Sequence, residues 1–91
     1  MGKVQENWNP EVFRNDIKKI VSRISGIDCE ELDDGVLIRE ELGVDSLMAM
    51  EIIARCEKLL DVKIAETLFA DIRTVGDFFD LLATLSGRVA V

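Results

Sequence analysis

The chain contains no histidine among its 91 residues, and this absence narrows the chemistry that it can perform. A serine nucleophile of the usual triad needs an imidazole to take its proton, so a Ser-His-Asp hydrolase is excluded. A Ser-Lys pair is the one catalytic alternative that the composition leaves open, and nothing in the sequence implies a pocket for it. The two cysteines have no histidine to complete a zinc site and form no CxxC pair. We therefore expect a protein that is not an enzyme and has no metal site.

Long apolar runs and basic clusters are lacking as well. No stretch approaches the 18 apolar residues of a membrane span, and the polar N-terminus has no secretory hydrophobic region. Eleven basic residues against eighteen acidic ones give a net charge of −7, whereas nucleic-acid binding needs clustered Lys and Arg. We expect a soluble, cytoplasmic monomer without nucleic-acid or membrane partners, and an acidic surface favours protein partners with basic surfaces.

Aromatic residues make up only 5% of the chain, although 48% of it is hydrophobic. A core rich in Leu, Ile and Val with little aromatic bulk suits a small helical bundle, and 91 residues make one domain. Cys56 falls on an apolar helix face and is expected to be a small core residue, while Cys29 lies in a polar loop. A disulfide between them is not expected in a reducing compartment.

Apolar residues at helical spacing predict helices at residues 10–25, 46–60 and 75–85, with a brief helix at 66–70. Start signals precede the three long helices: Asn9-Pro10, Asp45 and Thr74, the last with Asp77 as a weak capping-box partner. No strand-like alternation competes. The predicted fold class is all-α, a small bundle of three main helices plus a short one. The expected organisation is one domain at 9–85 with flexible tails at 1–8 and 86–91.

A long loop separates the first two main helices. Residues 27–45 are rich in acids and contain no sustained periodicity, and a nineteen-residue loop of this kind is often functional. A short helical turn is expected within it. The acids do not form a calcium-binding EF-hand, because placing Gly35 at the sixth loop position puts Leu32 at the third.

The helix at 46–60 has two stripes. One should face the core; it contains Ala49, Ile52, Ile53, Cys56 and Leu60. The other lies beside Ser46 and contains Leu47, Met50, Glu51 and Ala54, and Met48 extends the apolar surface. A helix with more apolar residues than its core side requires presents some of them to a partner. The alternative is that Met48 and Met50 pack under the long loop.

Ser46 is the most informative residue. It lies in the first turn of its helix, where unpaired backbone N–H groups and the helix dipole favour a phosphate group. A hydroxyl at this position is well sited to carry a phosphodiester. The alternative for an isolated Asp-Ser-Leu is an ordinary helix cap.

The surrounding pattern resembles an acyl carrier protein. The sharpest element is Leu42-Gly43-Val44-Asp45-Ser46-Leu47, continued by Met48-Ala49-Met50-Glu51-Ile52. Leu60-Asp61-Val62-Lys63-Ile64 and Thr74-Val75-Gly76-Asp77 follow at the separations that this family shows. The resemblance covers residues 9–85.

This resemblance implies that a phosphopantetheinyl transferase attaches 4′-phosphopantetheine from coenzyme A to Ser46. The terminal thiol of the arm would then carry acyl groups as thioesters to partners such as a ketosynthase and an acyltransferase or acyl ligase. Asp45 corresponds to the acidic residue that the transferase recognises. The remaining partner-recognition residues that the resemblance implies are Leu47, Met50, Glu51 and Ala54. Met48 is included with them because it extends the apolar surface of this helix.

The resemblance is closest to carriers of polyketide synthases. Fatty-acid carriers have an acid where this chain has Met48, and Arg55 and Lys58 bring the net charge of residues 46–60 to zero. Peptidyl carriers usually have a Gly-Gly-His/Asp-Ser form, from which Val44 departs. A polyketide carrier is therefore the favoured function. A fatty-acid or peptidyl carrier is the alternative within the family, and a passive helical interaction module without cofactor is the alternative outside it.

Overall fold

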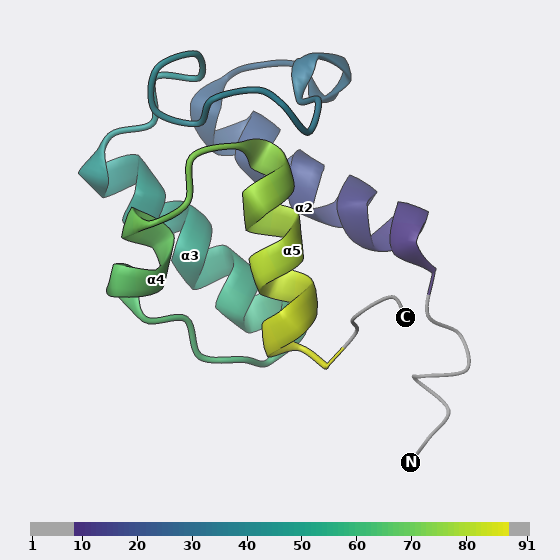
Figure 1. Cartoon of the computed structure of the whole chain (residues 1–91). Coiled ribbons are helices and arrows are strands. Elements are labelled where there is room, and N and C mark those ends of the chain that lie inside the picture. The colour runs from purple at the N-terminus through teal and green to yellow at the C-terminus, as the bar shows by residue number, and fades with distance from the viewer. Residues whose placement is uncertain (1–8, 88–91) are drawn as a thin grey trace.

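Four α-helices and one short 3-10 helix follow one another along residues 9–87, the part of the chain that the computed structural model describes (Figure 1). They are α2 (Pro10–Ser25), η1 (Cys29–Glu31), α3 (Ser46–Leu60), α4 (Glu66–Ala70) and α5 (Val75–Leu85). All four predicted helices are confirmed, as is the helical turn expected in the long loop. The tails were predicted at 1–8 and 86–91; residues 1–8 and 88–91 lie outside the described residues, and Ser86 is the C-terminal cap of α5. The domain boundaries stay a prediction. Within 9–87, no helix is long and apolar enough to cross a membrane.

Capping side chains explain where the helices begin and end. The Asn9 side chain accepts a hydrogen bond from the Glu11 N–H at 2.9 Å, and Gly26 ends α2 in the left-handed conformation (φ 82°). At α5, the Thr74 hydroxyl accepts from the Asp77 N–H at 3.0 Å while the Asp77 carboxylate accepts from the Thr74 N–H at 3.2 Å. The weak capping-box signal of the sequence is thus a complete reciprocal capping box.

The core lies between α2, α3 and α5 and under the long loop. Its buried side chains are Phe13, Ile17, Val21, Leu32, Ile38, Leu42, Val44, Ile52, Ile53, Cys56, Ile64, Phe69, Ile72, Val75, Phe78, Phe79 and Leu82. The apolar spacing of residues 75–85 predicts a buried face of Val75, Phe78, Leu81, Leu82 and Leu85, without Phe79. Phe79 is buried nonetheless, and the Arg14 guanidinium lies 4.8 Å from its ring centroid. Leu81 and Leu85, which the spacing places on the same face as Phe78, are only half-buried. The buried face of α5 is therefore rotated toward Phe79.

Backbone hydrogen bonds attach the long loop to the segment that precedes α5. The Ile38 N–H donates to the Arg73 carbonyl at 2.9 Å, and the Val75 N–H donates to the Val36 carbonyl at 2.9 Å. Leu37 and Thr74 thereby form an isolated antiparallel bridge, and residues 9–87 contain no longer strand. The loop crosses one end of the bundle (Figure 1) and delivers the chain to the start of α3. This attachment fixes the position of Ser46 relative to α4.

Candidate functional site

The start of α3 is capped by Asp45. Its backbone is extended, and its carboxylate accepts a hydrogen bond from the Met48 N–H at 2.8 Å. Ser46 is exposed, and its hydroxyl makes no hydrogen bond to any residue in the described range 9–87. The helix cap expected of Asp-Ser-Leu is therefore present, and Asp45 rather than Ser46 provides it. Its hydroxyl is available for chemistry.

The residues just before Ser46 hold the turn in place. Gly43 adopts φ 69°, a left-handed conformation that glycine reaches without steric cost. Val44 is buried, so it anchors the chain directly before Asp45 and Ser46 reach the surface. The sequence did not identify Val44 as a core residue, because a single valine between glycine and aspartate has no periodic pattern around it.

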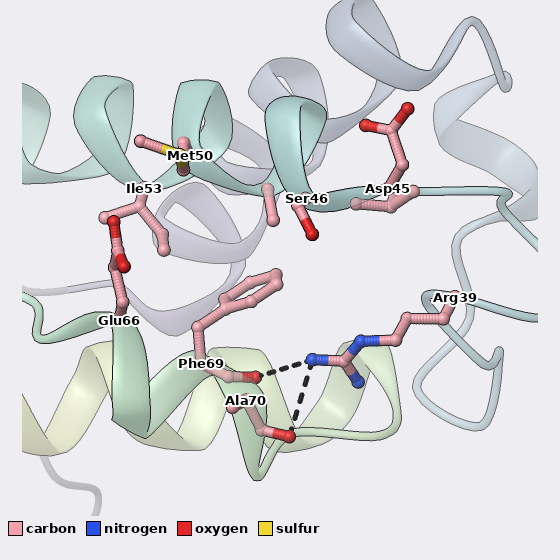
Figure 2. Close-up of a pocket in the computed structure, with 10 residues that line it drawn as sticks. Arg39, Asp45, Ser46, Met50, Ile53, Glu66, Phe69 and Ala70 are labelled. Atoms are coloured by element: carbon pink, nitrogen blue, oxygen red, sulfur yellow. Dashed lines mark hydrogen bonds between the residues drawn. The ribbon is translucent and has the colours of Figure 1, made fainter.

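A hollow lies beside Ser46, between the first half of α3 and the short helix α4 (Figure 2). Its volume is about 390 Å³. The lining residues are Arg39, Val44, Asp45, Ser46, Ala49, Met50, Ile53, Glu66, Phe69 and Ala70. Figure 2 shows the Ser46 hydroxyl directed into the space above the Phe69 ring. A group attached to this oxygen would enter the solvent at the mouth of a mostly apolar hollow.

Arg39 closes one side of this hollow. Its guanidinium donates hydrogen bonds to the carbonyls of Ile72 (2.6 Å), Phe69 (3.0 Å) and Ala70 (3.4 Å), and its central carbon lies 5.7 Å from the centroid of the Phe69 ring. Arginine is well suited to the carbonyl-rich end of a helix, because its charge complements the negative end of the dipole. Arg39 was not among the functional residues predicted from the sequence. The signal was present, since Arg39 is the only basic residue in the acidic segment 27–45.

The predicted second stripe of α3 is exposed. Leu47 is 75% exposed and Met50 is 52% exposed, and Glu51 and Ala54 are exposed as well. Met48 differs, because it is half-buried and packs against the core. The expectation that methionine packs inward therefore applies to Met48 and not to Met50. Leu47 and Met50 are three residues apart on α3, so the two exposed apolar side chains lie on neighbouring positions of the helix surface.

Charge on the exposed side of α3 is nearly balanced. The Arg55 guanidinium lies 3.8 Å from the Glu51 carboxylate, one turn along the helix. Glu57 has a structural role, because its carboxylate accepts a hydrogen bond from the Ile64 N–H at 2.7 Å. Glu51 is thus the acidic group beside the exposed apolar stripe, and Arg55 partly offsets its charge.

The described residues offer no second nucleophile at this site. Cys56 is fully buried, and burial raises the pKa of its thiol to about 12, so it stays protonated and inert as expected of a core residue. The lining of the hollow contains no lysine, so the Ser-Lys pair that the composition left open is not formed there. Residues 9–87 contain no group of three side chains suited to hold a metal ion.

Comparison with known proteins agrees with this geometry. A family model described as the phosphopantetheine attachment site matches residues 15–82. The chain is 32% identical over 82 residues to the polyketide-8 synthase acyl carrier protein 2 of Streptomyces avermitilis, covering 90% of this chain and 94% of that protein. It is 33% identical over 76 residues to the acyl carrier protein of Chlamydia felis, covering 84% of this chain and 97% of that one.

A much longer protein also contains a similar segment. The chain is 38% identical over 73 residues to the non-reducing polyketide synthase 1 of Elsinoe fawcettii. These residues make up 80% of this chain and 3% of that synthase. The similarity thus reaches both small carrier proteins and a single segment of a large synthase.

Proposed function

Since this chain belongs to the phosphopantetheine attachment site family, the acyl carrier proteins, we propose that Ser46 carries its arm and that the arm holds polyketide intermediates as thioesters. The cofactor of this family is 4′-phosphopantetheine, which is bound covalently. The observation that supports Ser46 as the attachment residue is its exposed hydroxyl. This hydroxyl is not needed to cap α3, because the Asp45 carboxylate does so. The group supplies a terminal thiol for thioester chemistry, and the protein supplies attachment and recognition.

Attachment would replace the O–H bond of Ser46 with an O–P bond. Its Oγ would attack the phosphorus that bears pantetheine in coenzyme A, and the bond from this phosphorus to the adenosine bisphosphate would break. A base of the transferase would take the hydroxyl proton. The exposed position of Ser46 in the first turn of α3 gives a second protein access to the oxygen.

The helical bundle has too little internal space to enclose an acyl chain, which favours a carrier whose acyl group stays outside the protein. The cavity between Val21, Ile52 and Phe78 has a volume of only about 10 Å³, the space of a single water molecule. An acyl chain does not fit there in this conformation. A tethered chain that stays outside reaches each partner at high effective concentration.

Partner enzymes would dock on the exposed part of α3. The apolar centre of this surface would consist of Leu47, Met50 and Ala54. Glu51 would supply one acidic contact, and the half-buried Met48 packs against the core beneath them. The partners proposed here are a phosphopantetheinyl transferase, which reads Asp45, and then a ketosynthase and an acyltransferase or acyl ligase. Polyketide intermediates are favoured because α3 lacks a strongly acidic face, and a relative named as a polyketide synthase carrier is among the proteins that align over most of their length.

The test is the intact mass after incubation with coenzyme A, magnesium and a broad-specificity phosphopantetheinyl transferase. The wild type should gain the mass of one phosphopantetheine group, and Ser46→Ala should gain none. Thr67→Ala, which removes an exposed hydroxyl from α4, is the matched control and should gain it fully. Folded wild type that gains no mass beside a modified control carrier would point instead to a passive interaction module.

A further inference from the structure

Arg39 is the positively charged residue in the lining of the hollow, which Ser46 also lines. Both residues line the hollow, and Figure 2 shows the Ser46 hydroxyl and the Arg39 guanidinium facing its open space. The other ionisable groups in the lining are Asp45 and Glu66. The Asp45 carboxylate is engaged with the Met48 N–H, and Glu66 lies toward the opposite end of the hollow, near Ile53 (Figure 2).

The guanidinium of Arg39 is held in place by hydrogen bonds that do not use all of its N–H donors. An arginine side chain has five N–H donors. Three are used: Nη1 donates once, to Ile72, and Nη2 donates twice, to Phe69 and Ala70. The two donors that remain are the Nε–H and the second Nη1–H, which lie on different edges of the guanidinium, so a single further acceptor can use only one of them.

The three partners of Arg39 are neutral carbonyls, so its charge has no paired carboxylate. In residues 9–87 the ion pairs are Arg14 with Asp34 and Arg55 with Glu51, and neither includes Arg39. An arginine fixed by carbonyls with spare donors is prepared to receive an anion, because little side-chain freedom is lost when the anion arrives. Arginine also matches the oxygens of a phosphate group.

We propose that Arg39 binds the phosphodiester that joins the arm to Ser46 and thereby holds the first part of the arm against the hollow between α3 and α4. This inference rests on the proposed function, because it requires the phosphodiester to be on Ser46. Arg39 keeps its carbonyl contacts and donates its free Nε–H to a phosphate oxygen, and its positive charge lies beside the phosphodiester. The pantetheine then leaves from the mouth of the hollow, beside Met50, toward the exposed stripe where partners dock.

A purely structural role for Arg39 makes a different prediction. If the guanidinium served only to fasten the loop to the end of α4, removing it would destabilise the unmodified and the modified protein equally. If it also binds the phosphodiester, the modified protein loses more. The difference between the two losses isolates the contact, because every effect common to both forms cancels.

The experiment measures thermal unfolding of the unmodified and phosphopantetheinylated forms of the wild type, Arg39→Gln and Arg55→Gln. Modification should raise the midpoint of the wild type by about 3 °C more than that of Arg39→Gln, as expected for a partly exposed ion pair in a domain of this size. Arg55→Gln also removes one positive charge from the helix that begins at Ser46, but Arg55 does not line the hollow. It should therefore show the same increment as the wild type.

Two nuclear magnetic resonance readouts do not depend on stability. The phosphorus resonance of the phosphodiester should move in Arg39→Gln and stay in place in Arg55→Gln. In the wild type, hydrogen exchange of the Arg39 guanidinium should slow on modification, which decides the matter even if Arg39→Gln does not fold.

The outcomes separate this inference from the proposed function. A wild type that gains no phosphopantetheine mass would overturn both. A wild type that gains the mass but shows the same midpoint increment as Arg39→Gln, or unchanged guanidinium exchange, would overturn the role of Arg39 alone.

Discussion

The carboxylate of Asp45 accepts a hydrogen bond from the Met48 N–H at 2.8 Å, and this contact separates two roles at the start of α3. Asp45 satisfies the open helix end, while the neighbouring Ser46 keeps an exposed and unbonded hydroxyl within the described part of the chain. If Ser46 were the cap, its oxygen would be occupied by the backbone. Asp45 therefore caps the helix, and Ser46 keeps its hydroxyl free for attachment.

Replacing Asp45 distinguishes its structural role from its proposed recognition by the transferase. Asp45→Ala should lower the free energy of unfolding by about 1 kcal/mol, because the cap is lost. Asp45→Asn keeps a capping oxygen and should stay within about 0.5 kcal/mol of the wild type, yet it should be modified more slowly. Urea unfolding and initial rates of modification measure the two effects. A normal modification rate for Asp45→Asn would show that the transferase does not read the charge.

Met48 and Met50 offer a matched pair on one helix. Met48→Ser removes a side chain that packs against the core and should lower the free energy of unfolding by about 1–2 kcal/mol. Met50→Ser changes an exposed side chain and should leave stability within about 0.5 kcal/mol while slowing acyl transfer from a partner enzyme about fivefold. Urea unfolding and transfer assays test both variants. If Met50→Ser also unfolded the protein, the exposed stripe would belong to the core.

The helices could be predicted from the sequence because their limits are set by local chemistry. Asn9-Pro10, Asp45 and Thr74 start the long helices, and Gly26 stops the first, whatever the rest of the chain does. The fold class follows from the same local patterns, whereas Ser46 as the attachment site follows from the resemblance to acyl carrier proteins and stays a prediction.

The missed features depend on contacts between distant segments. Phe79 is buried at a position that the expected stripe of α5 omits, and Arg14 of α2 covers its ring. Arg39 contacts carbonyls thirty and more residues away, after backbone bonds attach its loop to the segment before α5. No local sequence spacing indicates either arrangement. The hollow and the Arg39 guanidinium beside it could therefore be identified only from the structure.

The stability of the protein should depend on pH through Asp77 at the start of α5. Hydrogen bonds from the backbone N–H groups of Thr74 and Arg73 hold the pKa of the Asp77 carboxyl below its ordinary value. Because the folded pKa lies below the unfolded one, the contribution of Asp77 to stability is complete above about pH 5 and is lost as the pH falls through the folded value. Asp77→Asn should therefore be less stable than the wild type at neutral pH, with a gap that narrows in acid.

Chemical unfolding at about pH 7 and about pH 3 measures this gap. Asp80→Asn, which changes an exposed acid on the same helix outside the capping box, is the control. A gap for Asp77→Asn that is the same at both values would contradict the role of the ionised carboxylate.

The two cysteines should differ in reactivity. Cys29 is half-exposed, whereas Cys56 is buried with a thiol pKa raised to about 12. Iodoacetamide at neutral pH should alkylate Cys29 in the native protein and Cys56 only after denaturation, as mass spectrometry would show. Native labelling of Cys56 at the rate of Cys29 would mean that α3 opens readily. Phosphopantetheinylated protein should take up one further label on the thiol of its arm.

The most direct test of the central claim is to locate the added group within the modified protein. After treatment with transferase and coenzyme A, fragmentation mass spectrometry of the digested protein reads the modified residue from the sequence of fragments. We predict that all of the phosphopantetheine mass is on Ser46. The same mass on any other residue would contradict the account.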